Sequence, residues 1–128
     1  MILKIKVKKG GMSEVFNIEK DTVNKCKRQA IELFLEKHPK MSELGCKVEV
    51  LDGIFMSYVS LLMKPITGRR MVFEEIEPYA IHFGLKKQFQ PNGHHTYYWG
   101  DKQIEELQTI LINEKNYKRH ELSKHFQI

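Results

Sequence analysis

The chain has 128 residues, of which 41% are hydrophobic and 29% are charged, and its formal net charge is +5. This length suits one domain, or two very small ones that share a core, and the composition excludes a disordered or collagen-like chain. The longest apolar run, residues 54–63, is too short to cross a bilayer, and the alternating start has no apolar leader segment. We therefore expect a cytoplasmic protein without a membrane partner.

The sequence offers little that could support catalysis or hold a metal. Its two cysteines, Cys26 and Cys46, form no CxxC motif, so we expect reduced thiols, with a disulfide between them as the alternative. No HxxxH or HExxH motif occurs, and the adjacent His94 and His95 would point to opposite sides of a strand. We expect no metal, no cofactor and no catalytic residue, and hence no enzyme.

The first 20 residues predict a β-hairpin. Leu3, Ile5 and Val7 alternate with lysines, the period of a strand with one buried face. Gly10-Gly11 supplies a turn, and residues 14–19 return the chain. The lysines at positions 4, 6 and 8 share the solvent face, where they either meet phosphate or protect a sheet edge from aggregation.

An amphipathic helix over residues 22–37 should follow, with Asp21 or Thr22 as its cap. Its apolar stripe is formed by Val23, Cys26, Ala30 and Phe34. Residues 47–51 alternate again and predict a third strand. The expected result is a β-β-α-β unit over residues 1–66, a mixed sheet with the helix across one face.

The middle of the chain is harder to assign. Asp52-Gly53 is typical of a hairpin turn, which predicts that residues 54–63 form a central strand with both faces covered. A helix over residues 58–63 is the competing interpretation. Pro65 to Gly68 should form a loop.

The C-terminal part predicts short helices around a hairpin. Pro78 fits the first turn of a helix over residues 77–83, which Gly84 would end. Residues 89–99 look like a hairpin with Pro91-Asn92-Gly93 at its tip. Asp101 would cap the next amphipathic helix, Asn116 would break it, and a last short helix would begin at Lys118.

Several residues of this part recur in the pattern of a known DNA-binding family. They are Ala80, Gly84-Leu85, the run Tyr97-Tyr98-Trp99-x-Asp101, the stripe Ile104, Leu107 and Ile110, and the later pair Tyr117 and Leu122. In these residues the segment 77–126 resembles the winged helix-turn-helix of MerR-type regulators and phage excisionases. Lys86-Lys87-Gln88 stands where that family has its recognition helix.

The resemblance implies an α+β fold in which the sheet unit packs against a winged-helix-like unit over residues 67–128. It also implies a small accessory or regulatory protein of transcription, from a phage or other mobile element, that binds double-stranded DNA. Independently, residues 78–100 contain lysines and glutamines but no acid. Lysine contacts phosphate, glutamine can contact adenine, and a hairpin can enter the minor groove. The candidate DNA contacts are Arg69, Arg70, Lys86, Lys87, Gln88, Gln90, His94 and His95.

Two alternatives stay open. The aromatic residues 97–99 could be core, and Lys86 and Lys87 could be merely solvated. The chain could also be a protein-binding inhibitor or adaptor, with the strand Tyr97–Trp99 and the helix over residues 102–114 as its docking surfaces.

Overall fold

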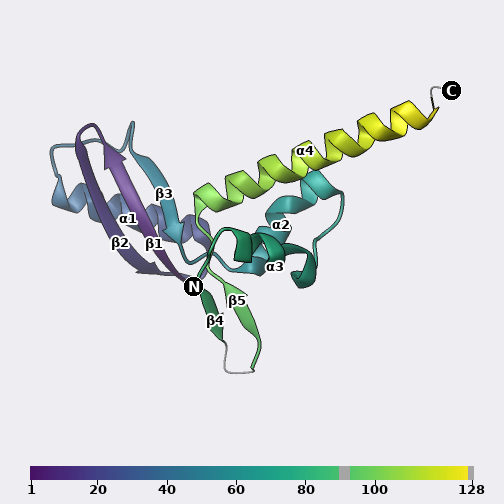
Figure 1. Ribbon diagram of the computed structural model, residues 1–128. Coiled ribbons are helices and arrows are strands. Elements are labelled where there is room, and N and C mark those ends of the chain that lie inside the picture. Colours follow the sequence, from purple (N-terminus) through teal and green to yellow (C-terminus); the bar gives the residue numbers. More distant parts are fainter. Residues whose placement is uncertain (90–92, 127–128) are drawn as a thin grey trace.

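The computed structural model describes residues 1–89 and 93–126, with side chains up to Glu114 (Figure 1). It is an α+β structure in which a sheet with one helix lies beside a group of helices and a small hairpin. The elements of the first part are β1 (Ile2–Lys9), β2 (Met12–Glu19), α1 (Val23–Lys37) and β3 (Lys47–Asp52). Those of the second part are α2 (Met56–Thr67), α3 (Phe73–His82), β4 (Lys87–Phe89), β5 (His95–Tyr97) and α4 (Asp101–Phe126).

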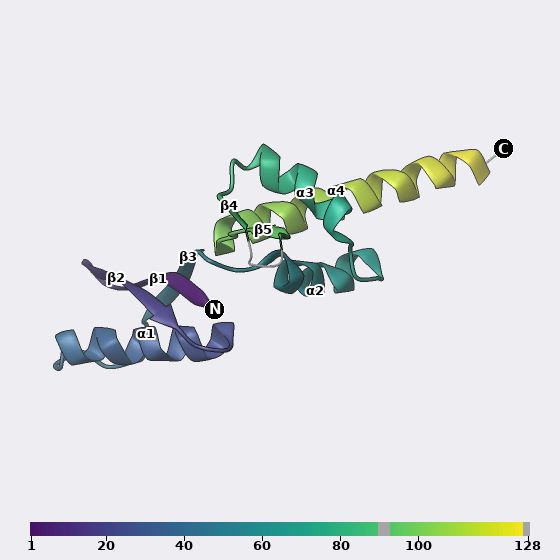
Figure 2. The same cartoon turned by 90° about the horizontal axis from the view of Figure 1, so that it is seen from below.

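The β-β-α-β prediction is confirmed, but the sheet is antiparallel throughout rather than mixed. Its strand order is β2-β1-β3, and both neighbours of β1 run antiparallel to it. The reason is topological, because the α1 crossover carries the chain from one sheet edge to the other and so places β3 beside β1 instead of β2. Figure 2 shows α1 lying along one face of the sheet.

Helix α1 forms where its pattern predicts. The Thr22 hydroxyl caps it by accepting a hydrogen bond from the Lys25 amide at 3.1 Å. Its predicted stripe is buried against the inward side chains of β1, among them Leu3 and Ile5. Cys26 and Cys46 are both free thiols, so the alternative of a disulfide is excluded.

The opposite face of the sheet carries the lysines of β1, and protection of a sheet edge is the wrong explanation for them. β1 is the central strand, so these lysines do not lie on an edge. Lys4 is registered opposite Asp52, and Lys6 opposite Glu49. The cross-strand acids make this a surface of mixed charge.

The predicted central strand over residues 54–63 is wrong, and the competing helix is right. Only Ile54 pairs as a strand does, in a single bridge to Trp99. Helix α2 begins two residues later and buries Met56, Val59, Ser60 and Met63, which are spaced as one helical face. The run is apolar on other faces too, which hides this spacing in the sequence.

The turn at Asp52-Gly53 closes no hairpin, contrary to the prediction. Gly53 has a φ of 109°, and a Cβ at this position would overlap the carbonyl oxygen of Ile2. Glycine therefore lets the chain leave β3 beside the start of β1. Pro65 lies inside α2 rather than in a loop, and Gly68 ends that helix with a φ of 79°.

Helix α3 starts four residues before the predicted Glu77, so Pro78 lies within it. Its start is stabilised by the Glu75 carboxylate, which accepts a hydrogen bond from the Val72 amide at 3.1 Å. Pro78 has no amide hydrogen and so removes one helical hydrogen bond, but the residue lies on the exposed face of the helix. Burial of Ile76 and Ala80 offsets that loss.

Helix α4 is continuous, so the predicted break at Asn116 is wrong. Asparagine is only moderately unfavourable in a helix, and residues 101–126 contain neither glycine nor proline. The end of α4 extends beyond the other elements (Figure 1).

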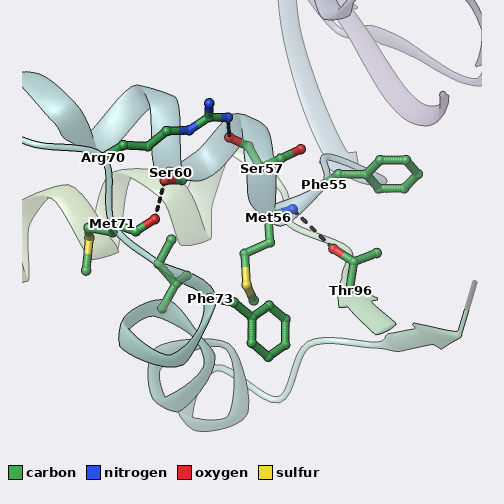
Figure 3. A pocket seen from close by; sticks show the side chains of 9 residues that line it. Phe55, Met56, Ser57, Ser60, Arg70, Met71, Phe73 and Thr96 are labelled. Carbon is green, nitrogen blue, oxygen red and sulfur yellow. Dashed lines mark hydrogen bonds between the residues drawn. The ribbon is translucent and has the colours of Figure 1, made fainter. Parts of the chain in front are cut away.

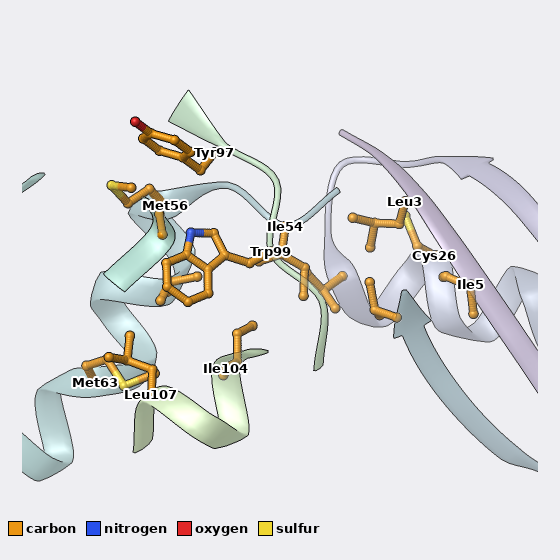
Figure 4. Close-up of a cluster of buried hydrophobic side chains, with 14 of the residues drawn as sticks. Leu3, Ile5, Cys26, Ile54, Met56, Met63, Tyr97, Trp99, Ile104 and Leu107 are labelled. Atoms are coloured by element: carbon orange, nitrogen blue, oxygen red, sulfur yellow. The ribbon is translucent and has the colours of Figure 1, made fainter. Parts of the chain in front are cut away.

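One hydrophobic core runs through both parts of the molecule. Trp99 and Ile54 lie between the sheet core and the side chains of α2 and α4, such as Met63 and Leu107 (Figure 4). Helix α2 contacts α3 and α4, so it belongs spatially with the C-terminal elements. Within the described residues, no helix combines the length and the apolar character that crossing a membrane requires.

Candidate nucleic-acid interface

The hairpin of β4 and β5 projects from the helices (Figure 1). Its register pairs Lys87 with Tyr97, Gln88 with Thr96, and Phe89 with His95. Because side chains alternate along a strand, Lys87, Phe89, His95 and Tyr97 share one face, while Gln88 and Thr96 share the other. The predicted hairpin is confirmed, but its first strand begins two residues before the predicted start at residue 89. Of its predicted tip, residues 91 and 92 lie outside the described residues.

A row of aromatic rings follows the first of these faces. The ring of Phe73 on α3 lies 6.4 Å from that of Tyr97, centroid to centroid. Tyr97 is followed by His95 at 5.8 Å, and His95 by Phe89 at 5.8 Å. From Tyr97 outwards the exposed fraction of the side chains rises, from 5% for Tyr97 to 69% for Phe89. The row is therefore attached to the core at Tyr97 and ends in solvent at Phe89.

Glu77 of α3 holds the middle of this row. Its Oε2 accepts hydrogen bonds from His95 Nε2 at 2.8 Å and from the Tyr97 hydroxyl at 2.9 Å. The bonds from His95 and then Tyr97 lower the pKa of Glu77, so its carboxylate is ionised near neutral pH. An ionised carboxylate only accepts hydrogen bonds, so His95 Nε2 carries a proton. Burial, and then the bond to Glu77, raises the pKa of Tyr97.

Of the eight side chains predicted to contact DNA, four are exposed on or next to this hairpin. Lys86, Lys87 and Gln88 are exposed, although they lie on and just before a strand and form no helix. Lys87 Nζ lies 5.3 Å from the centroid of the Phe89 ring. His94 is also exposed, whereas His95 is half-buried against Glu77. Gln90 lies outside the described residues.

The two arginines lie at the other end of α3 and are held by protein groups. Arg69 makes a bidentate ion pair with Glu75, at 2.7 and 2.6 Å. The bond to Arg69 is the main reason why the pKa of Glu75 is about 2. Arg70 donates to the carbonyl of Ser57 at 3.1 Å. Arginines and lysines thus flank α3, whose 10 residues span about 15 Å, and do not form a single cluster.

Helix α3 itself is poorly suited to contact a polyanion. In a DNA-binding helix-turn-helix, the second helix enters the major groove. α3 occupies the second position after α2, but it contains Glu74, Glu75 and Glu77 and no lysine or arginine. The positive charge near α3 is supplied by the hairpin that follows it and by residues 68–72, which precede it.

A pocket of about 430 Å³ opens between α2, α3 and β5 (Figure 3). Its lining includes Met56, Phe73 and Ile76, with Arg70 at the edge. The buried polar groups in the wall bond to one another. The Ser60 hydroxyl donates to the Met71 carbonyl at 2.5 Å, and the Thr96 hydroxyl accepts from the Met56 amide at 3.3 Å. The Thr96 bond also ties β5 to the start of α2.

The sequence interpretation missed the Glu77–His95–Tyr97 cluster. The partners are separated by 18 and 20 residues, and no local spacing reveals such a pair. Tyr97 and Trp99 are buried, which confirms these two as core residues, whereas Tyr98 between them is half-buried. Within the part of the chain that the structure describes, no three His, Cys, Asp or Glu residues are grouped to hold a metal ion.

Comparison of the chain with protein-family models, curated proteins and solved structures finds no match.

Proposed function

We propose that this chain binds double-stranded DNA through the β4–β5 hairpin and acts as a DNA-binding accessory or regulatory protein. One observation carries the proposal. Lys86, Lys87 and Gln88 are exposed together on a projecting hairpin, in a segment without any acid from residue 78 to residue 100. Such a surface attracts phosphates, and the amide of Gln88 adds a group that can contact a base edge.

The order of elements supports the same proposal. Two helices, α2 and α3, are joined by residues 68–72, and a glycine ends the first of them, as in helix-turn-helix units. A hairpin follows, and the Ile54–Trp99 bridge continues from it towards the start of α2. This order resembles that of a winged helix. Because α3 is acidic, the proposal assigns DNA contact to the wing and not to the second helix.

The test is a binding titration of a labelled random duplex at about 50 and about 200 mM salt, the range over which phosphate contacts show themselves. The double variant Lys86→Gln, Lys87→Gln should bind more weakly and lose about one unit of salt slope for each phosphate contact removed. The matched control is Lys4→Gln with Lys8→Gln. It removes the same charge from exposed positions on the sheet, so it separates a local contact from net charge.

The double hairpin variant should weaken binding more than the control does. Equal effects of both pairs would contradict the assignment to the hairpin, and absence of binding at the lower salt concentration would contradict DNA binding.

Docking onto another protein is the second candidate, and one feature of α3 favours it. Ile81 is 62% exposed on this helix, on the same side as Glu74 and Pro78. An apolar side chain beside acids suits a basic protein surface better than it suits DNA. Ile81→Ala should leave the DNA titration unchanged if only the hairpin contacts DNA.

A further inference from the structure

We infer that Phe89 is an insertion residue, which enters the DNA between two base pairs from the minor groove and kinks the duplex. The inference rests on the proposed DNA binding and deepens it, because it names how the hairpin engages its target. The juxtaposition that carries it is a solvent-exposed aromatic ring beside Lys87, at the outer end of an aromatic row anchored in the core.

Exposure alone is weak support, because single apolar side chains are common on protein surfaces. Phe89 differs in how it is held. Its backbone is paired with His95 in the hairpin, and its ring lies 5.8 Å from the imidazole of that residue. His95 is fixed in turn by Glu77 and by the edge of Phe73, at 5.0 Å. The Phe89 ring therefore reaches solvent from a paired strand, with the fixed imidazole of His95 on one side.

The charged residues near the Phe89 ring indicate what kind of partner it can contact. Lys87 precedes it in β4 and Lys86 lies just before that strand. Glu77, the nearest acid in sequence on the N-terminal side, is bonded to His95 and Tyr97. A partner that suits this surface offers negative charge beside a flat apolar surface. Stacked base pairs between two phosphate backbones meet this description, and apolar side chains are the wedges that minor-groove proteins insert between base steps.

The geometry also divides the work between the two faces of β4. Lys87 shares the face of Phe89, whereas Gln88 faces the other way. When the ring enters a base step, Lys87 lies beside a flanking phosphate and neutralises it, whereas Gln88 points away from that step. Insertion partly unstacks the step and bends the duplex towards the major groove.

The test measures DNA bending and DNA binding separately. A duplex of about 30 base pairs, with a donor dye at one end and an acceptor at the other, reports bending as increased energy transfer. Fluorescence anisotropy of a singly labelled copy reports binding. The variants are Phe89→Ala, Phe89→Trp and, as the control for loss of an exposed apolar side chain, Leu44→Ala, whose residue is 86% exposed in the sheet unit. All should melt like the wild type.

Wild type and Leu44→Ala should bend the duplex equally. Phe89→Ala should bind roughly ten- to a hundredfold more weakly, the usual effect of losing one aromatic stacking partner, and should no longer bend the DNA when saturating. Phe89→Trp should restore bending, because a second aromatic ring can fill the step.

The outcomes separate the two proposals. If the wild type does not bind DNA, the proposed function fails and the inference with it. If the wild type binds without bending, or if Phe89→Ala bends as the wild type does, insertion is excluded while DNA binding stands.

Discussion

The backbone amide of Val50 donates a hydrogen bond to Oδ2 of Asp101 at 2.8 Å, which ties the outer strand of the sheet to the first residue of α4. The neighbouring residues make further contacts across the same seam. Gly100 lies against the carbonyl of Leu51, and Lys102 Nζ lies 3.7 Å from Glu49 Oε1. Together these contacts fix the sheet relative to the helices and hence the direction in which the hairpin projects.

Asp101→Ala should destabilise the protein by about 1–3 kcal/mol, because it leaves a partly buried amide without its charged acceptor. The Val50 amide should then exchange its hydrogen faster in a hydrogen-exchange experiment. Asp101→Asn keeps an acceptor oxygen and should be milder. The matched control is Asp21→Ala, which removes an exposed pair with Lys25 and should change stability by less than about 1 kcal/mol. Unaltered exchange at Val50 in Asp101→Ala would show that the seam does not depend on this bond.

Gly100→Ala should lower the free energy of unfolding by about 1–3 kcal/mol, as overpacking does in a close contact. A Cβ at this position would overlap the Leu51 carbonyl, which is backbone and cannot rotate away. Gly11→Ala is the control, because its Cβ would meet nothing within 4 Å. Urea unfolding of both variants measures the difference. Equal unfolding midpoints would mean that the contact between Gly100 and Leu51 accommodates the added methyl group without loss of stability.

Phe34→Ala should destabilise the protein by about 3–5 kcal/mol, because it empties a fully buried site between α1 and the sheet. Phe89→Ala removes the same side chain from an exposed position and should leave the melting temperature nearly unchanged. If Phe34→Ala melts like the wild type, the assigned inner face of α1 is wrong.

The Arg69–Glu75 pair should make stability sensitive to acid. The pKa of Glu75 is about 2 in the folded protein, below its ordinary value of 4.5. A lowered pKa means that the stabilisation is complete above about pH 4.5 and is lost as the pH falls towards 2. Glu75→Gln should thus melt below the wild type at pH 7, and the gap should close by about pH 2. Glu74→Gln changes an exposed neighbouring residue, and the difference between its melting temperature and that of the wild type should not depend on pH in this way.

Gln88→Ala should change DNA preference more than overall affinity. A base-edge contact is worth roughly 1–3 kcal/mol, and this benefit is limited to sequences that offer the right base. Titrations on A·T-rich and G·C-rich duplexes of equal length should show the ratio of the two affinities moving towards one. Lys86→Gln should weaken both to a similar extent. A uniform loss for Gln88→Ala would make it a phosphate contact.

The sequence by itself determined the elements whose signals are local. The alternation around Leu3 and Val50, the cap at Thr22 and the stripe that includes Phe34 each lie within one strand or helix, so propensity and periodicity were sufficient to find them. The exposed hairpin lysines were also found in this way, because composition and position along the chain identify a basic segment without acids.

Only the tertiary structure decided the rest, because the deciding interactions join residues far apart in the chain. Residues 56–67 are apolar on several faces, and their helix is settled by packing on α3 and α4 and not by local preference. Burial of Ile76 outweighs the hydrogen bond that Pro78 removes. Glu77 meets His95 and Tyr97, and Val50 meets Asp101, across gaps of 18 to 51 residues. Such contacts have no spacing rule in the sequence, since their loop-closure entropy is offset only when the whole core assembles.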